Sequence, residues 1–332
     1  RMAGKRFFVS KAIVIREYGG PEVLREEQIE IDEPDINEIF IRQTAIGVHY
    51  HDIYVRSGLY KTLNLPGVPG VEATGVVEKL GSNVSRFNIG DRVAYVSSEY
   101  GAYASHRRLN QIKAIKLSDS ISDELIATNF SRALTVIMLA TKVTNLNSSH
   151  RILVTAAAGG VGRLLCQWAD TVGACVVGSV SSLGNADLAK SYGCRHTLVY
   201  DQDDFLDRVK EITNGEGFDI VYYSVGIDTF PVSLKVTAKC GHLVNFGQSS
   251  GAVDPVLMQS LANRSLTLTR PILFHYIEDE NSYENLAEAA FEFLKSPSLK
   301  LPTPKPYCLK EASIAHSILE SRAGGGSLYL QP

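Results

Sequence analysis

The chain of 332 residues is poor in several features that define whole classes of protein. No stretch approaches the roughly 20 apolar residues that span a bilayer, so we expect no membrane segment. Lysine and arginine do not outnumber the acidic residues, and a net charge of −3 disfavours nucleic acid as a partner. The five cysteines form no Cys-x-x-Cys pair, and the N-terminal residues do not have the pattern of a signal peptide. Both observations predict a cytoplasmic protein with reduced thiols.

Ligands for a zinc ion are also scarce. A catalytic zinc site needs three protein side chains that converge on one point. His49 and His51 are residues of a metal-binding type, but no cysteine occurs before Cys166. We therefore expect no bound metal, and we interpret the two histidines as polar pocket lining or surface residues.

What the chain does contain is a glycine-rich turn inside a strand–helix–strand pattern. An apolar, β-branched run over 152–157 predicts a buried strand, and a Gly-Gly-Val-Gly turn follows at 159–162. Apolar residues then recur at helical spacing, and residues 175–180 predict a second strand. Glycine lets the backbone approach a pyrophosphate, and the start of a helix directs N–H groups and a positive dipole end at it. The stretch therefore predicts a dinucleotide-binding unit.

The remaining pattern predicts an α/β protein with two domains. Short strands separated by turns occupy the first 130 residues, which is typical of a small barrel-like β domain. From residue 152 onward, six strands alternate with helices and predict a doubly wound parallel six-stranded sheet. A proline-rich link is expected at 297–306, and residues 327–330 are expected to form a last strand that returns to the first domain.

Seven further segments, spread along nearly the whole chain, have sequences typical of one family: Gly19–Leu24, Asp52–Tyr60, Pro69–Gly75, Gly90–Tyr95, Ala156–Gly162, Phe246–Gly251 and Glu320–Arg322. In these segments the chain resembles the zinc-free quinone oxidoreductases related to zeta-crystallin, a branch of the medium-chain dehydrogenase/reductase superfamily. The resemblance implies a GroES-like β-barrel catalytic domain at 1–130 and 272–332, and a Rossmann dinucleotide-binding domain at 131–271. It also implies a homodimer joined through the nucleotide domains, with the active site in the cleft between the domains.

The same resemblance implies roles for individual residues. Four are implied near the nicotinamide and the acceptor, as walls and hydrogen-bond donors: His49, Tyr50, Tyr54 and Thr135. The implied cofactor-binding residues are Gly159, Gly160, Val161, Gly162, Ser181, Ser182, Asn185, Tyr200, Ser224, Phe246, Gly247, Gln248, Ser249, Pro271, Ile272, Leu273 and Arg322. Three positions depart from close relatives, which usually have asparagine, lysine and aspartate where this chain has His49, Asn185 and Tyr223.

The choice of cofactor depends on the residues that face the adenosine ribose. NAD-selective folds place an acidic residue about 20 positions beyond the glycines, where it binds the ribose 2′-OH. Here that distance falls at Ser181 and Ser182, and no acid occurs before Asp187. A 2′-phosphate is therefore tolerated, and the fork of Arg322 would suit it. We expect NADPH, with a weaker preference than in relatives because Asn185 replaces a lysine.

We therefore expect an enzyme that transfers a hydride from NADPH to a small electrophilic acceptor, most simply a quinone. The ligand set for a metal that would polarise a carbonyl is missing, which favours an acceptor that is already electrophilic. Reduction of the carbon–carbon double bond of an enone or enal is an alternative with the same hydride geometry. A non-catalytic crystallin-like or RNA-binding protein is the alternative from another class.

Overall fold

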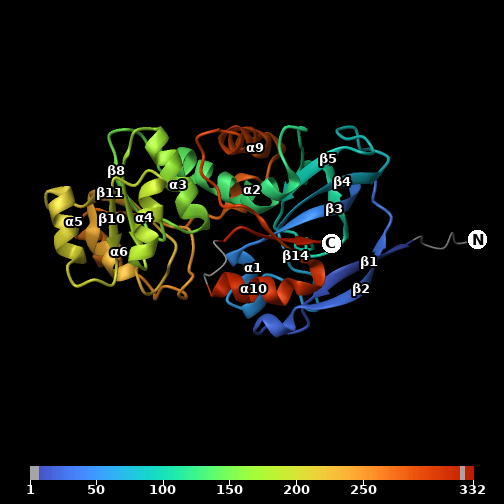
Figure 1. The fold of residues 1–332 in the computed structure, drawn as a ribbon, viewed down its shortest axis with the longest axis horizontal. Coiled ribbons are helices and arrows are strands. Elements are labelled where there is room, and N and C mark those ends of the chain that lie inside the picture. Colours follow the sequence, from blue (N-terminus) through green and yellow to red (C-terminus); the bar gives the residue numbers. More distant parts are fainter. Residues whose placement is uncertain (1–6, 322–325) are drawn as a thin grey trace, which may run out of the picture. The chain divides into compact units, whose positions relative to one another are not determined.

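The computed structural model describes residues 7–321 and 326–332, and the chain divides into two compact units (Figure 1). The first unit comprises Arg1–Ser131, Ile277–Pro297 and Leu301–Pro332. The second comprises Arg132–Tyr276 and Ser298–Lys300.

The second unit is built on a parallel six-stranded sheet in the order β10-β9-β8-β11-β12-β13. Leu153, Val177 and Val221, from three neighbouring strands, meet in one buried core. Helices pack against the strands, so the predicted doubly wound α/β sheet is confirmed. Its strands are β8 (Arg151–Val154), β9 (Cys175–Val180), β10 (His196–Val199), β11 (Phe218–Tyr223), β12 (Thr237–Asn245) and β13 (Thr267–Thr269). Its helices are α3 (Gly160–Thr171), α4 (Leu183–Ser191), α5 (Phe205–Thr213), α6 (Phe230–Val236), α7 (Met258–Ala262) and α8 (Leu273–Tyr276), with a π-helix at Met138–Val143.

The first unit is mostly antiparallel β structure. A seven-stranded sheet has the order β14-β15-β3-β4-β5-β7, with β6 paired to β3, and β1 and β2 form a separate two-stranded sheet. The strands are β1 (Phe7–Val14), β2 (Arg25–Asp32), β3 (Glu38–Val48), β4 (Glu72–Leu80), β5 (Arg92–Val96), β6 (His106–Asn110), β7 (Ala114–Lys116), β14 (Lys305–Cys308) and β15 (Leu328–Gln331). The helices are α1 (Tyr50–Ser57), α2 (Asp123–Ile137), α9 (Glu280–Leu294) and α10 (Ala312–Glu320), with short 3-10 turns at Pro21–Val23, Gln111–Lys113 and Leu309–Glu311. Helix α2 contains the boundary between the two units.

The last strand of the chain fixes the end of β3. In β15, Leu328 pairs antiparallel with Val48, and Leu330 pairs with Ile46. All four side chains are fully buried. The predicted return of the chain to the first domain is therefore confirmed, and β3 is held where it leads into α1.

The proline-rich link was predicted at 297–306, but a strand already begins within it at Lys305. Residues 305–308 form β14, which pairs parallel with β15 from Lys305↔Leu328 to Cys308↔Gln331. Proline is tolerated in this strand because β14 lies at one end of the sheet order, where Pro306 need not donate to a second neighbour.

Candidate functional site

The glycine-rich turn connects β8 directly to the first turn of α3. Gly159 is the N-cap, with extended backbone, and Gly160 is the first helical residue. A side chain at Gly162 would collide with the backbone oxygen of Ala156, so the helix packs against the turn only because this residue is glycine. The first N–H groups of α3 have no partner within the helix, and such groups are donors of the kind that bind an anionic pyrophosphate.

The residues expected near the adenosine ribose gather after β9 and β10. Ser182 is the N-cap of α4, and its hydroxyl accepts from the backbone N–H of Asn185 at 3.4 Å. Tyr200 follows β10, and its backbone N–H donates to the carbonyl of Val180, the last residue of β9, at 3.2 Å. Ser181 lies between Val180 and Ser182, so the structure brings all four candidates to one end of two neighbouring strands.

The ends of β8, β11 and β12 are also tied together. The backbone N–H of Ser224 donates to the hydroxyl of Thr155 at 3.0 Å, and the N–H of Ser249 donates to the carbonyl of Ser224 at 3.1 Å. The N–H of Phe246 donates to the carbonyl of Tyr223 at 3.0 Å. These bonds place residues 246–249 beside the end of β11. Strand order reverses between β8 and β11, and ligands of such sheets bind outside the carboxyl ends of the strands at that point.

The other cofactor candidates are distributed as follows. Residues 271–273 follow β13 at the same carboxyl-terminal end of the sheet, with Leu273 opening α8. Thr135 lies on α2 in the second unit. Arg322 lies outside the described residues. The binding roles of all these residues stay predictions.

Tyr223, the departure that the sequence left unexplained, is a core residue. It is 1% exposed and its ring lies 5.8 Å from that of Phe230. Burial raises the pKa of its hydroxyl, so it stays neutral.

The acceptor-side candidates lie where β3 passes into α1. Tyr50 and Tyr54 are one helical turn apart, with ring centroids 6.2 Å from one another, and Tyr54 lies 5.0 Å from Tyr60. The hydroxyl of Tyr50 donates to the carbonyl of Leu319 at 3.1 Å. The structure thus brings the two predicted tyrosines together in an aromatic cluster of the first unit.

His49 precedes that helix and is paired inside the unit. Its ring Nε2 lies 2.5 Å from Oε2 of the fully buried Glu72. Glu72 also accepts from the backbone N–H of Ser131 at 2.9 Å and from its hydroxyl. Within residues 7–321 and 326–332, no group of three or more His, Cys, Asp or Glu side chains is placed to hold a metal ion. The donor set around His49 therefore does not fit zinc.

Buried polar groups form a hydrogen-bonded network that includes residues of α1, and the direction of each hydrogen bond in it follows from the chemistry of its members. Arg56 donates to Nδ1 of His316 at 3.2 Å, and because guanidinium only donates, that ring carries its proton on Nε2. Nε2 lies 2.8 Å from the hydroxyl of Tyr103, which donates onward to Oδ2 of Asp52 at 3.1 Å. Oδ2 also accepts from the backbone N–H of His49 at 2.8 Å. We call Asp52, Arg56, Tyr103 and His316 the buried relay; it holds the N-terminus of α1 in place.

The buried relay has unusual protonation behaviour. Burial raises the pKa of Asp52 to about 6, against the opposing effects of His49 and Tyr103. Burial, helped by the charge of Arg56, lowers the pKa of His316 to about 3. Arg56 itself is neutralised by Glu320 through two hydrogen bonds of 3.1 and 2.7 Å. At neutral pH the relay therefore contains a neutral imidazole and an ionised carboxylate.

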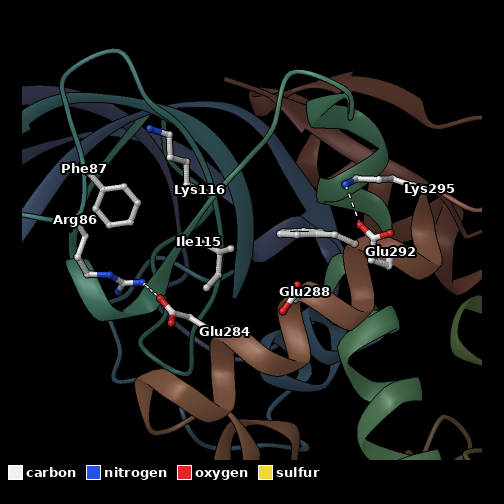
Figure 2. A pocket seen from close by; sticks show the side chains of 9 residues that line it. Arg86, Phe87, Ile115, Lys116, Glu284, Glu288, Glu292 and Lys295 are labelled. Carbon is white, nitrogen blue, oxygen red and sulfur yellow. Dashed lines mark hydrogen bonds and ion pairs between the residues drawn. The ribbon is translucent and has the colours of Figure 1, made fainter.

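A surface pocket of about 570 Å³ in the first unit is a different feature (Figure 2). Two pairs of its charged groups interact with one another, Arg86 with Glu284 and, at 3.2 Å, Lys295 with Glu292. It contains none of the predicted site residues, and we interpret it as a solvated groove. It is lined by Arg86, Phe87, Ile115, Lys116, Glu284, Glu288, Phe291, Glu292 and Lys295.

Sequence reasoning missed the partners that support α1. Glu72 lies in the segment Pro69–Gly75 but was given no role, and Tyr103 and His316 were not considered at all. Asp52 and Arg56 lie in a segment that carries the family resemblance, which is the one signal that could have pointed to them. His316 is 260 positions from Arg56, and no local pattern relates residues that far apart.

Comparison with protein-family models supports both units. Residues 35–119 match the alcohol dehydrogenase GroES-like domain, and residues 160–292 match the zinc-binding dehydrogenase model. Together with the dinucleotide-binding sheet, these matches define a dehydrogenase of the medium-chain dehydrogenase/reductase superfamily. The zinc in the second description has no fitting donor set among the described residues, as shown above.

Individual relatives identify the family within this superfamily. Quinone oxidoreductase 1 of Escherichia coli K12 is 40% identical over 96% of this chain and 99% of its own length. A 2-haloacrylate reductase from a Burkholderia species is 34% identical over 97% of this chain and 98% of its own. The crystal structure of Escherichia coli quinone oxidoreductase complexed with NADPH has a TM-score of 0.91 at 40% identity, covering 97% of this chain and 100% of that one. The chain belongs to the quinone oxidoreductase family.

Proposed function

We propose that this protein is an NADPH-dependent quinone reductase that works without a metal ion. The proposal rests on one observation: the glycine turn and the predicted cofactor residues lie together at the carboxyl ends of the six parallel strands. The family supports it, because a solved relative at 40% identity is a complex with NADPH.

In this mechanism the glycine turn and the start of α3 bind the pyrophosphate, while Ser181, Ser182, Asn185 and Tyr200 surround the adenosine ribose. NADPH supplies the hydride when it is bound. The protein contributes position, because holding donor and acceptor in reactive geometry removes much of the entropic part of the barrier. Tyr50, Tyr54 and His49 serve as walls and hydrogen-bond donors for the acceptor, on a helix that the buried relay holds in place.

A quinone is the acceptor that this site suits best. Its product is a delocalised phenolate, which needs less stabilisation than the alkoxide formed from a simple ketone. The hydroquinone oxygens take protons from water as the product leaves, so no single side chain needs to be an essential acid. Enones and enals demand the same hydride geometry and remain the alternative acceptors.

We also propose that the protein is a cytoplasmic homodimer. Strand β13 forms one end of the parallel sheet, and a second copy could extend the sheet there. No helix among the described residues is long and apolar enough to cross a membrane. Sedimentation analysis giving about twice the chain mass of 36.3 kDa would support the dimer, and a single chain mass would contradict it.

The test is consumption of NADPH by the purified protein, followed at 340 nm. We expect rapid oxidation with 1,4-benzoquinone or a naphthoquinone, slower oxidation with an enone or an enal, and none without an acceptor. A higher kcat/KM for enones than for quinones would favour the alternative reaction. Binding of NADPH without turnover of any acceptor would indicate a non-catalytic protein.

A further inference from the structure

Two buried cysteines of the second unit lie in contact with one another. Cys166 belongs to α3, and Cys194 follows the end of α4. Their sulfur atoms are 3.4 Å apart, and the thiol of Cys194 donates to the sulfur of Cys166. Both are free thiols, with 0% and 5% of their surface exposed. The contact links the helix that begins at the glycine turn to the end of the helix that begins after Ser182.

The pair is packed tightly against β9 and the residues that follow β8. A Cβ placed on Gly178 of β9 would be 2.7 Å from Sγ of Cys194 and 2.7 Å from Cβ of Ala157. The sulfur therefore has room only because residue 178 is glycine. Ala157 leads into the glycine turn, and β9 leads into Ser181. A change in the position of the Cys194 sulfur would displace segments that enter the proposed cofactor site from two strands.

We propose that Cys166 and Cys194 form a redox switch, in which a hydroperoxide oxidises the pair to a disulfide that weakens the binding of NADPH. This rests on the proposed function in that NADPH is the cofactor concerned. A disulfide bond is about 2.05 Å long, so its formation draws the two sulfur atoms together from 3.4 Å. The start of α3 has no room for such a shift, because a Cβ on Gly162 would already lie 2.2 Å from the carbonyl oxygen of Ala156. Close packing of this kind transmits a displacement to the turn.

Cys194 is the sulfur that reacts first. It is the more exposed of the two, whereas its hydrogen bond and burial raise the pKa of the Cys166 thiol, which stays protonated. Cys194 lies in the turn that ends α4, where its backbone N–H donates to the carbonyl of Ala189 at 3.3 Å. Helix ends open at a lower free energy than the core of a sheet, so a small oxidant reaches this sulfur without global unfolding.

The oxidation transfers two electrons from the thiols to the peroxide. The Cys194 sulfur attacks one oxygen of hydrogen peroxide, the O–O bond breaks, and a sulfenic acid and one water are formed. The Cys166 sulfur then attacks the sulfenic sulfur and forms the S–S bond. The hydroxyl group leaves with the proton of Cys166 as a second water. The two thiols lose two electrons and two protons in all, and a dithiol such as dithiothreitol reverses the change.

The experiment uses the full chain with its two exposed cysteines replaced, Cys240→Ser and Cys308→Ser, so that peroxide cannot couple copies through them. This background protein is treated with hydrogen peroxide and then with dithiothreitol. Peptide mapping by mass spectrometry identifies the disulfide, and calorimetry gives the Kd for NADPH. We expect a Cys166–Cys194 disulfide and an affinity for NADPH that is about five- to tenfold weaker, the lower part of the usual range for coupled sites. Dithiothreitol should reverse both changes.

The matched control adds Cys166→Ala to the same background. Peroxide can still oxidise Cys194 in this protein, but no bridge to residue 166 can form. We expect its Kd for NADPH to stay within about twofold after peroxide treatment. Cys194→Ala carries the same expectation. The comparison of oxidised with re-reduced background protein needs neither variant, so it decides the proposal even if neither of them folds.

The proposal is overturned if peroxide produces no disulfide between Cys166 and Cys194. It is equally overturned if the disulfide forms and the Kd for NADPH stays within about twofold of the reduced protein. An equal loss of affinity in the Cys166→Ala control would assign the effect to oxidation of Cys194 alone and would also rule out the switch. The proposed function fails separately, if the reduced protein binds NADPH but reduces no quinone.

Discussion

Replacing Asp52 by asparagine should change how the stability of the first unit depends on pH. The carboxyl is fully buried and its pKa is raised from 3.8 to about 6. Between these values the folded protein keeps a proton that the unfolded chain has released. Stability from this group is therefore fully present below pH 3.8 and is lost as pH rises through 6.

The size of the effect follows from the shift. A difference of about two pKa units corresponds to about 3 kcal/mol between the low and the high end of this window. Asparagine cannot titrate, so the variant lacks this dependence. The free energy of unfolding of the wild type minus that of Asp52→Asn should therefore fall by about 2 to 3 kcal/mol between pH 4 and pH 7.5.

The assay is urea unfolding at constant ionic strength at pH 4, 5, 6 and 7.5, followed by circular dichroism. His316 titrates in the opposite sense: its lowered pKa gives stability above pH 6.5 that is lost as pH falls toward 3. It is present in both proteins, so taking the difference between them removes its contribution. The only tryptophan, Trp168, belongs to the second unit, and its fluorescence should report a transition that the substitution leaves unchanged.

A control and a clear contrary outcome complete the test. Asp187→Asn removes a carboxylate whose side chain is 89% exposed, and it controls for the loss of one negative charge. If the Asp52→Asn difference does not vary with pH, burial does not perturb the Asp52 carboxyl. If the wild type instead gains stability over the variant as pH rises, hydrogen bonds from His49 and Tyr103 outweigh burial and the reasoning has the wrong sign.

Tyr54→Phe should lower kcat/KM for a quinone by about tenfold or less, the scale of one neutral hydrogen bond, and a thousandfold loss would mean specific acid catalysis. Arg322→Ala should weaken NADPH far more than NADH in a binding titration; equal losses would remove Arg322 from the 2′-phosphate site. Gly162→Ala should reduce NADPH affinity by about tenfold or more and lower the melting temperature, because its Cβ would meet the backbone of Ala156. Gly184→Ala, whose Cβ would meet nothing within 4 Å, should do neither. Elemental analysis of the purified protein should find no stoichiometric zinc, and alcohols should not be oxidised with NADP⁺; about one zinc per chain with chelator-sensitive activity would contradict this.

The sequence by itself determined the core of the second unit. Its strands are short apolar runs separated by helices, and this pattern arises because parallel strands are buried on both faces. The glycine turn could also be predicted from the sequence. The structure explains why the glycine is required there, because a side chain at Gly162 has no room. The family resemblance assigned Ser181, Tyr200 and Ser224 to one cofactor site, and these residues follow β9, β10 and β11, whose carboxyl ends share one edge of the sheet.

Two strands of the first unit, β2 and β14, were harder to predict from the sequence. Strand β2 reads Arg-Glu-Glu-Gln-Ile-Glu-Ile-Asp, a composition with low strand propensity, and it forms because it pairs with β1 over its whole length. Strand β14 contains a proline and exists because β15 offers it a partner. In both cases a neighbour in space, and not the local sequence, decides the conformation.

Only the tertiary structure decided how the candidate side chains are supported. Asp52 and Tyr103 are 51 positions apart, and Tyr103 and His316 are 213 positions apart. Arg132 reaches Gly160 from a different helix. Such contacts have no periodic signature, because they depend on the packing of whole elements rather than on the spacing of residues within one. The sequence therefore located the cofactor turn and the tyrosines of α1, whereas the side chains that hold them appear only once β-sheet and helices are packed in three dimensions.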